Sequence, residues 1–221
     1  MGPRSPARPP ARRTGTPTPR LVAVSAPPPR FIGLTGGVGA GKSEALAALG
    51  RLGAATVSSD QLVHELLGSE EMRALLVARW GDEVAPNGEV DRARIASLVF
   101  ERPEELEWLE GVLHPRVGER IAAWREALPE GTEFAVVEVP LLFEAGMEPL
   151  FEAVIAVVAR DDERRRRISA RGVGELADRS GRQLTQAEKA ARATHVVEND
   201  GTLGDLEARL ADLLPSLRGG R

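Results

Sequence analysis

The sequence lacks features that whole classes of protein need. None of its 221 residues is cysteine, which excludes disulfides and thiolate metal sites. No stretch approaches the roughly 18 consecutive apolar residues of a membrane-spanning helix, so we expect no membrane association. The N-K-x-D motif with which small GTPases bind guanine is absent, and we find no internal repeat. The length allows one sizeable core, or one core with an inserted subdomain.

Acidic residues are also missing from the first thirty positions. Residues 1–30 instead hold nine of the sixteen prolines and six arginines. Proline fixes φ and removes a backbone donor, so we expect a disordered Pro/Arg-rich tail here, and its prolines argue against a targeting helix. The remaining chain is acidic on balance, which argues against general nucleic-acid binding. We expect a cytoplasmic protein that is a monomer or a weak homo-oligomer.

Short apolar runs alternate with helical patterns through the rest of the chain. Apolar runs at 31–35, 54–57, 134–139, 153–159 and 195–197 predict five strands. Helical patterns lie at 43–52, 61–67, 70–80, 91–100, 161–171, 187–193 and 203–214. A further helix begins at Pro103 and is expected to break at His114-Pro115, because proline disfavours helical backbone at the residue before it. The alternation predicts an α/β fold, a five-stranded parallel sheet flanked by helices, with a flexible C-terminal tail at 215–221.

A glycine-rich loop follows the first predicted strand. Residues 36–43 read Gly-Gly-Val-Gly-Ala-Gly-Lys-Ser and match G-x-x-x-x-G-K-[ST] at every fixed position. Glycines let backbone N–H groups converge on an anion, and the helix starting at Lys42 points its positive dipole end at the same phosphates. We expect Lys42 to reach the β- and γ-phosphates of ATP and the Ser43 hydroxyl to bind Mg²⁺. The predicted ATP-binding residues here are Gly37, Val38, Gly39, Ala40, Gly41, Lys42, Ser43 and Glu44.

The loop alone does not decide the class of P-loop protein. An ordinary glycine-rich turn is a further alternative, which the strand before the loop and the helix after it disfavour. A motor or AAA-type ATPase needs a strand that ends in an acid, and residues 134–138, ending in Glu138, resemble such a strand. A small-molecule kinase needs a base near the acceptor hydroxyl and a mobile basic lid.

Asp60 is the candidate for that base. It follows the second predicted strand, at the edge where parallel sheets place functional residues. A carboxylate there could accept the proton of a substrate hydroxyl. Aspartate is also a favoured helix N-cap, so Asp60 could equally cap the next helix or lie at the surface.

The predicted helix at 161–171 is strongly basic. Arg164, Arg167 and Arg171 are spaced i, i+3 and i+7 and share one face. Such a face is often merely solvated. Beside a P-loop, however, arginines can clamp phosphate groups.

A series of segments, in order, resembles the dephospho-coenzyme A kinase family. Residues 34–43 (LTGGVGAGKS) are similar to the family's opening LTGGIGSGKS, and residues 139–144 (VPLLFE) to its VPLLFE motif. The other similar positions are 55–60 (strand and D-x-D turn), His114-Pro115 (HP pair), Arg167 and Arg171 (lid arginines), Gln183, and 199–201 (N-x-G). The resemblance covers about residues 31–214, and the combination of LTGG, HP and PLLFE at this spacing is highly specific.

The resemblance implies a P-loop kinase fold with a helical substrate subdomain at 62–130 and a basic lid at 160–190. It implies transfer of the γ-phosphoryl group of ATP, with Mg²⁺, to the ribose 3′-hydroxyl of dephospho-CoA, the last step of coenzyme A synthesis. Another P-loop nucleoside or nucleotide kinase is the alternative. Asn199 would lie near the adenine of ATP. The implied catalytic residues are Lys42, Asp60, Arg167 and Arg171, and the implied substrate-binding residues are Asp60, His114, Pro140, Leu141, Leu142 and Glu144.

Four positions depart from the family pattern. Ser58 replaces the first aspartate of the D-x-D turn, which leaves Asp60 as its one carboxylate. Glu138 and His195 stand where aspartate is common. Glu44 stands where threonine commonly follows the P-loop serine, and its charge would repel an α-phosphate unless the side chain turns outward. None of the four removes a residue that the chemistry cannot lose.

Overall fold

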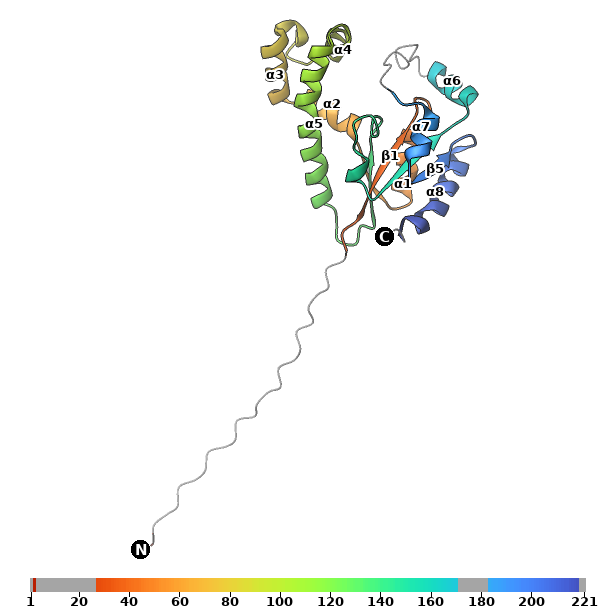
Figure 1. Cartoon of the computed structure of the whole chain (residues 1–221). Coiled ribbons are helices and arrows are strands. Elements are labelled where there is room, and N and C mark those ends of the chain that lie inside the picture. The colour runs from red at the N-terminus through yellow and green to blue at the C-terminus, as the bar shows by residue number, and fades with distance from the viewer. Residues whose placement is uncertain (1, 3–26, 171–182, 219–221) are drawn as a thin grey trace.

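Five parallel strands form the centre of the molecule (Figure 1). The computed structural model describes residues 2, 27–170 and 183–218. The strands are β1 (Arg30–Gly36), β2 (Ala55–Ser58), β3 (Phe134–Glu138), β4 (Ala153–Val158) and β5 (His195–Glu198). Their order in the sheet is β2-β3-β1-β4-β5, and every neighbouring pair is parallel. The predicted α/β fold and its five-stranded parallel sheet are confirmed, and the strand order brings the carboxyl ends of β1, β2 and β3 together.

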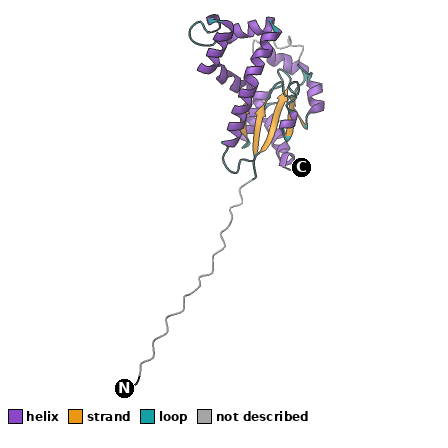
Figure 2. Cartoon of the chain, turned by 60° about the vertical axis from the view of Figure 1, so that its left-hand side comes forward, coloured by secondary structure: helices purple, strands orange, loops and turns teal. Residues whose placement is uncertain are grey.

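The two faces of the sheet bury different sets of apolar side chains. Because strand side chains alternate, Ile32 and Leu34 pack on one face with α1 (Lys42–Arg51) and α8 (Leu203–Arg218). Phe31 packs on the opposite face with residues of α2 (Ser59–Leu67), α5 (Pro103–Glu126) and the segment after β3. Figure 2 shows helices on both sides of the strands. This double cover explains why the central strands are almost wholly apolar.

Four helices form a lobe beside the sheet, at the upper left of Figure 1. They are α2 (Ser59–Leu67), α3 (Glu70–Trp80), α4 (Arg92–Glu101) and α5 (Pro103–Glu126). The lobe has its own apolar core, in which Met72, Leu76 and Val84 are almost completely buried. Short 3₁₀ turns lie at Asp82–Val84 and Glu148–Leu150.

The predicted break at His114-Pro115 was wrong. Helix α5 runs through Pro115 without interruption. Proline removes one backbone hydrogen bond, to the carbonyl of Gly111, but both residues are exposed, so water can satisfy that carbonyl. Leu113 and Ile121 are buried on either side of the proline, so tertiary packing holds the helix together across it.

Element ends differ from the sequence prediction at both termini. Arg30 already belongs to β1, and α8 continues past Leu214 to Arg218. The prediction of a flexible tail was therefore wrong for residues 215–218, because buried Leu217 anchors the last turn of α8 to the core. The remaining helices are α6 (Asp161–Ala170) and α7 (Gln186–Arg192). Predictions for residues 1, 3–26, 171–182 and 219–221, Arg171 included, lie outside the described residues.

None of the helices that the structure describes is long and apolar enough to cross a membrane.

Candidate active site

The glycine-rich loop connects the end of β1 to the start of α1, as predicted. Gly39 and Gly41 have positive φ angles of 74° and 94°, which L side chains rarely adopt. A Cβ at Gly41 would lie 2.1 Å from Nδ2 of Asn199, and one at Gly39 would lie 2.8 Å from the carbonyl oxygen of Arg164. Glycine is therefore required here both for backbone conformation and for close packing.

Lys42 and Ser43 lie in the first turn of α1. The Lys42 ammonium donates hydrogen bonds to the carbonyls of Gly36 at 3.1 Å and Gly37 at 3.2 Å. It therefore lies over the mouth of the loop, where a lysine of this motif meets phosphate. Ser43 is exposed beside it, so its hydroxyl is available to a metal ion.

Asn199 lies beneath the loop, just after β5. Its side chain is 4% exposed, and its Nδ2 donates to the carbonyl of Ala40 at 2.9 Å. A cavity of about 310 Å³ next to it is lined by Glu44, Arg167, Ala170, Asn199, Gly201 and Leu203. Glu44 thus borders a cavity beside the loop, and Arg167 lines the same cavity.

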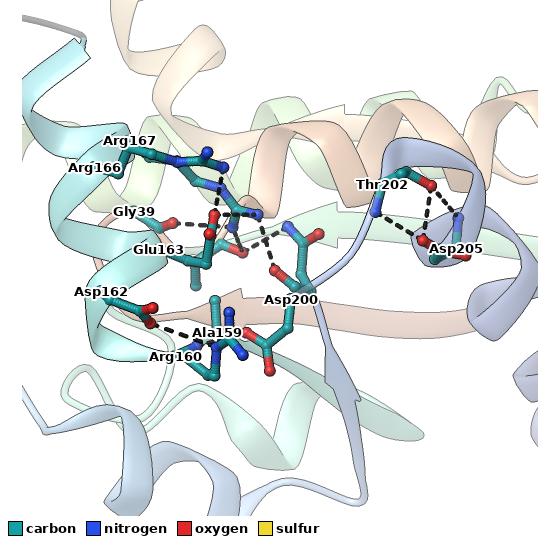
Figure 3. Close-up of polar contacts among 12 residues, drawn as sticks. Gly39, Ala159, Arg160, Asp162, Glu163, Arg166, Arg167, Asp200, Thr202 and Asp205 are labelled. Atoms are coloured by element: carbon teal, nitrogen blue, oxygen red, sulfur yellow. Dashed lines mark hydrogen bonds and ion pairs between the residues drawn. The ribbon is translucent and has the colours of Figure 1, made fainter.

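Helix α6 lays Arg164 and Arg167 against the loop, and Figure 3 shows the contacts of Arg167. Arg164 donates from Nε to the carbonyl of Val38 at 2.9 Å. Arg167 donates to the carbonyls of Gly39 and Ala40, and at 2.9 Å to that of Asn199. Arg166 pairs with Glu163 on its own helix instead. The shared face predicted for Arg164 and Arg167 is therefore the face that contacts the glycine-rich loop, which we also call the phosphate loop.

Asp60 and Glu138 bring carboxylates to the same edge of the sheet. Part of Asp60 reaches solvent, yet burial by the surrounding atoms raises the pKa of its carboxyl, and the charge of Lys42 opposes that rise. Burial also raises the pKa of Glu138, against the opposing effects of a hydrogen bond from Ser58 and the charge of Lys42. Helix α2 has Ser58 as its N-cap. The alternative in which Asp60 caps this helix is therefore wrong.

A buried lysine holds the segment after β3, residues 139–144, in place. Lys189 of α7 is 1% exposed, and its ammonium lies 2.9 Å from Oε1 of Glu144. The same ammonium donates to the carbonyl of Pro140, which also accepts from Thr35 at 3.2 Å. Burial raises the pKa of Glu144, but the hydrogen bonds from Lys189 and from backbone N–H groups outweigh that effect and leave the pKa lowered. Glu144 is therefore ionised at neutral pH.

The other predicted substrate-binding residues differ in how far their side chains are exposed. Leu141 is 39% exposed beside this segment. Leu142 is 0% exposed, and its Cδ1 would lie 2.5 Å from a Cβ at Gly33, so its side chain is part of the core. His114 is exposed on α5. The structure thus brings Lys42, Ser43, Asp60 and Asn199 to one edge of the sheet, but not the Leu142 side chain.

Comparison with known proteins identifies the family. A family model described as dephospho-CoA kinase matches residues 30–205. The chain belongs to the dephospho-CoA kinase family. It is 37% identical over 189 residues to the dephospho-CoA kinase of Moorella thermoacetica, covering 83% of this chain and 88% of the relative. It is 39% identical over 200 residues to that of Anaeromyxobacter dehalogenans, covering 87% and 94% of the two chains.

Two solved structures have folds similar to that of this chain. A crystal structure from Thermus thermophilus is 36% identical, with a TM-score of 0.75, and the match covers 86% of this chain and 99% of that one. The dephospho-CoA kinase structure from Campylobacter jejuni has a TM-score of 0.58 at 21% identity, covering 85% and 97% of the two chains, and supports the fold. The chain is therefore a member of a family of kinases with the P-loop fold.

The family pattern explains one departure seen in the sequence. Ser58 replaces an aspartate of the family's D-x-D turn, and its side chain donates to the Glu138 carboxylate. The register of the sheet sets this contact, because Ser58 of β2 lies opposite Glu138 of β3. Glu138 therefore brings a second carboxylate close enough to Asp60 for the charge of Asp60 to raise the pKa of Glu138, which the sequence alone did not reveal.

The donor groups at this edge suit a magnesium ion that is held mainly by phosphates. Mg²⁺ commonly takes one or two protein oxygen ligands, several waters and phosphate oxygens. Ser43 and the carboxylates near Lys42 provide such oxygens. Within the described residues, no group of three or more His, Cys, Asp or Glu side chains could hold a metal by itself.

Two further residues of this region were missed by sequence reasoning. Lys189 follows a capping-box residue, Glu188, and reads as part of an ordinary exposed helix. Glu138 resembled a Walker B acid, but its contact with Ser58 depends on strand order. A lysine or glutamate carries no local signal of burial, so only the fold reveals these contacts.

Proposed function

We propose that this chain transfers the γ-phosphoryl group of ATP to the ribose 3′-hydroxyl of dephospho-CoA and so forms coenzyme A. The family match over residues 30–205 carries the proposal. The placement of Asp60 near Lys42 supports it, since the pKa of Asp60 responds to the charge of Lys42. A phosphoryl acceptor and a phosphoryl donor must meet between such groups.

Each residue then has a defined task. The loop N–H groups and Lys42 hold the β- and γ-phosphates, and Arg167 adds positive charge from α6. Asp60, as a carboxylate, accepts the proton of the 3′-hydroxyl or orients that group. Bound Mg²⁺ would neutralise charge on the phosphates, with the Ser43 hydroxyl as its protein ligand.

The proposal also assigns residues to the side of the site that binds the acceptor. Residues 62–130 would form the substrate subdomain and residues 160–190 the lid, with Arg171 as a second lid arginine. Pro140, Leu141 and Glu144 would border the acceptor, and His114 would lie near it. Leu142 would act through packing under this segment, because it is fully buried. A cytoplasmic location and a monomeric or weakly homo-oligomeric state stay predictions from the sequence.

A panel of acceptors tests the proposal. The purified chain, with Mg·ATP, is assayed against dephospho-CoA, adenosine, AMP and other nucleosides and nucleotides. The highest kcat/KM is expected for dephospho-CoA. An equal or higher kcat/KM for a simple nucleoside or nucleotide would favour the alternative kinase function, which the family match does not support.

A further inference from the structure

Helix α7 carries a buried lysine to which the proposed mechanism gives no task. Lys189 is 1% exposed, and a lysine is almost never fully buried unless it is paired. Its ammonium has two partners, Oε1 of Glu144 at 2.9 Å and the carbonyl of Pro140. Pro140 lies near the start of the segment after β3, and Glu144 lies at its end. One side chain therefore holds both ends of a segment that the proposed function places beside the acceptor.

The carbonyl of Pro140 is held from two sides. Val139, just past β3, still donates its N–H to the carbonyl of Leu34 in β1 at 2.9 Å. Proline has no N–H, so the next peptide can be held only through its carbonyl. That carbonyl accepts from Lys189 and, at 3.2 Å, from the hydroxyl of Thr35, which suits the two lone pairs of the oxygen. Thr35 is 0% exposed and directly precedes the phosphate loop. One oxygen atom thus joins β1, the segment after β3 and α7.

Helix α7 is also tied to the element that carries the loop arginines. Oε1 of Glu144 accepts from the N–H of Leu184, just before α7, at 2.9 Å. The side-chain amide of Gln186 accepts from the N–H of Ala159 at 2.9 Å and donates to its carbonyl at 2.8 Å. Ala159 lies two residues before α6, from which Arg167 contacts the phosphate loop. Helix α7 therefore connects the segment after β3 with α6 and, through α6, with the loop.

We propose that Lys189 is a positioning residue for phosphoryl transfer, which sets the place of the segment after β3 relative to the phosphate loop. The proposal rests on the proposed function, in which that segment borders the acceptor. Proteins accelerate phosphoryl transfer mainly by positioning the reactants and stabilising charge. A misplacement of about 1 Å can lower the rate about 10²-fold. Because it is buried, Lys189 acts through Pro140 and Glu144 rather than on a substrate.

Kinetics and ATP binding of Lys189→Met test this role. Methionine removes the ammonium but keeps a long, unbranched side chain. The variant is assayed well below its unfolding midpoint, with the folded fraction measured by circular dichroism. The kcat for coenzyme A formation, per folded molecule, should fall about 10-fold or more, because the acceptor is misaligned. The Kd for Mg·ATP, measured by calorimetry, should not change, because the contacts of the phosphate loop are retained.

Leu217→Ala is the matched control for lost stability. Leu217 is 2% exposed in the apolar core. It lies next to Arg218, whose carbonyl accepts from Arg30 at the start of β1 at 3.2 Å, so it is at the opposite edge of the sheet from the phosphate loop. This substitution should destabilise the fold by leaving a cavity. The kcat per folded molecule should stay as in the wild type.

Thr35→Val tests the same carbonyl from its other side. Valine is β-branched like threonine and lacks only the hydroxyl, so this variant should fold even if Lys189→Met does not. Its kcat should fall about 3-fold or more, the scale of one lost hydrogen bond, at unchanged Kd for Mg·ATP. The double substitution should lower kcat by less than the product of the two single effects, because both donors hold one oxygen.

The other outcomes overturn the assignment. A kcat for Lys189→Met that falls no further than that of Leu217→Ala would show that Lys189 only stabilises the fold. An unchanged kcat in Thr35→Val would refute the role of the Pro140 carbonyl. A higher Kd for Mg·ATP with unchanged kcat would place the effect at the nucleotide instead. If the wild-type chain forms no coenzyme A, the proposed function fails and this role with it, whereas normal wild-type turnover beside unaltered variants would refute this role alone.

Discussion

At the scale of single residues, the proposed mechanism depends on a carboxylate placed beside a lysine. Burial raises the pKa of Asp60, and the nearby charge of Lys42 limits that rise without reversing it. A carboxylate with a raised pKa is a stronger base than ordinary aspartate. The sequence left open whether Asp60 serves as a helix cap. The structure gives that position to Ser58, so the Asp60 side chain is available for chemistry.

Replacing Asp60 with asparagine should lower kcat by about 10²-fold or more, the scale of general-base catalysis. The reactive form is the carboxylate, so wild-type kcat/KM should fall as the pH drops through a pKa above the ordinary value of 3.8. In Asp60→Asn this acid limb should be absent from the residual activity. Asp82→Asn, which changes an exposed aspartate of the helical lobe, serves as the control. Unchanged turnover in Asp60→Asn would contradict the base role.

At the scale of elements, α6 and the phosphate loop act as one unit. Arg164 and Arg167 together donate to the carbonyls of Val38, Gly39 and Ala40. Sequence spacing predicted that Arg164 and Arg167 share a face. It could not predict what that face contacts, because the contact joins residues more than a hundred positions apart.

Removing the Arg167 side chain should weaken this unit. We expect Arg167→Ala to lower kcat/KM for ATP by about 10- to 100-fold, because a guanidinium hydrogen-bonded to three carbonyls around the loop is lost. Arg166→Ala is the matched control, since Arg166 is exposed and pairs with Glu163 of its own helix. Initial rates at varied ATP measure both variants. Equal effects of the two substitutions would contradict the specific role of Arg167.

Helix α7 fixes the segment after β3 through the buried pair of Lys189 and Glu144. Lys189→Met leaves the Glu144 carboxylate without its partner and should cost about 3–5 kcal/mol of unfolding free energy. Lys189→Met combined with Glu144→Leu should recover much of that loss, because it removes both charges. Urea denaturation measures these values. Arg209→Ala, which breaks the exposed pair with Glu198, is the control and should lower the unfolding free energy by at most about 1 kcal/mol. If Lys189→Met lowers it by no more than this control, the buried pair does not stabilise the fold.

At the scale of the whole molecule, the functional groups meet because parallel strands end at one edge of the sheet. The P-loop, the strands and Asp60 were predictable, since glycine spacing and apolar runs are local signals. Strand order, the contact of Ser58 with Glu138 and the burial of Lys189 and Leu142 were not, because they depend on packing between distant segments. The false break at Pro115 has the same origin, since buried Leu113 and Ile121 outweigh the local preference of proline.

The most direct test follows the phosphoryl group itself. Purified wild-type chain is incubated with dephospho-CoA and Mg·ATP labelled at the γ-phosphoryl group, and the product is analysed for the position of the label. We predict one coenzyme A formed per ATP consumed, labelled at the ribose 3′-position. In Lys42→Ala, which loses the loop's main cation, the rate should fall by about 10²-fold or more. Binding of ATP without any labelled coenzyme A, or label at another position, would contradict the account.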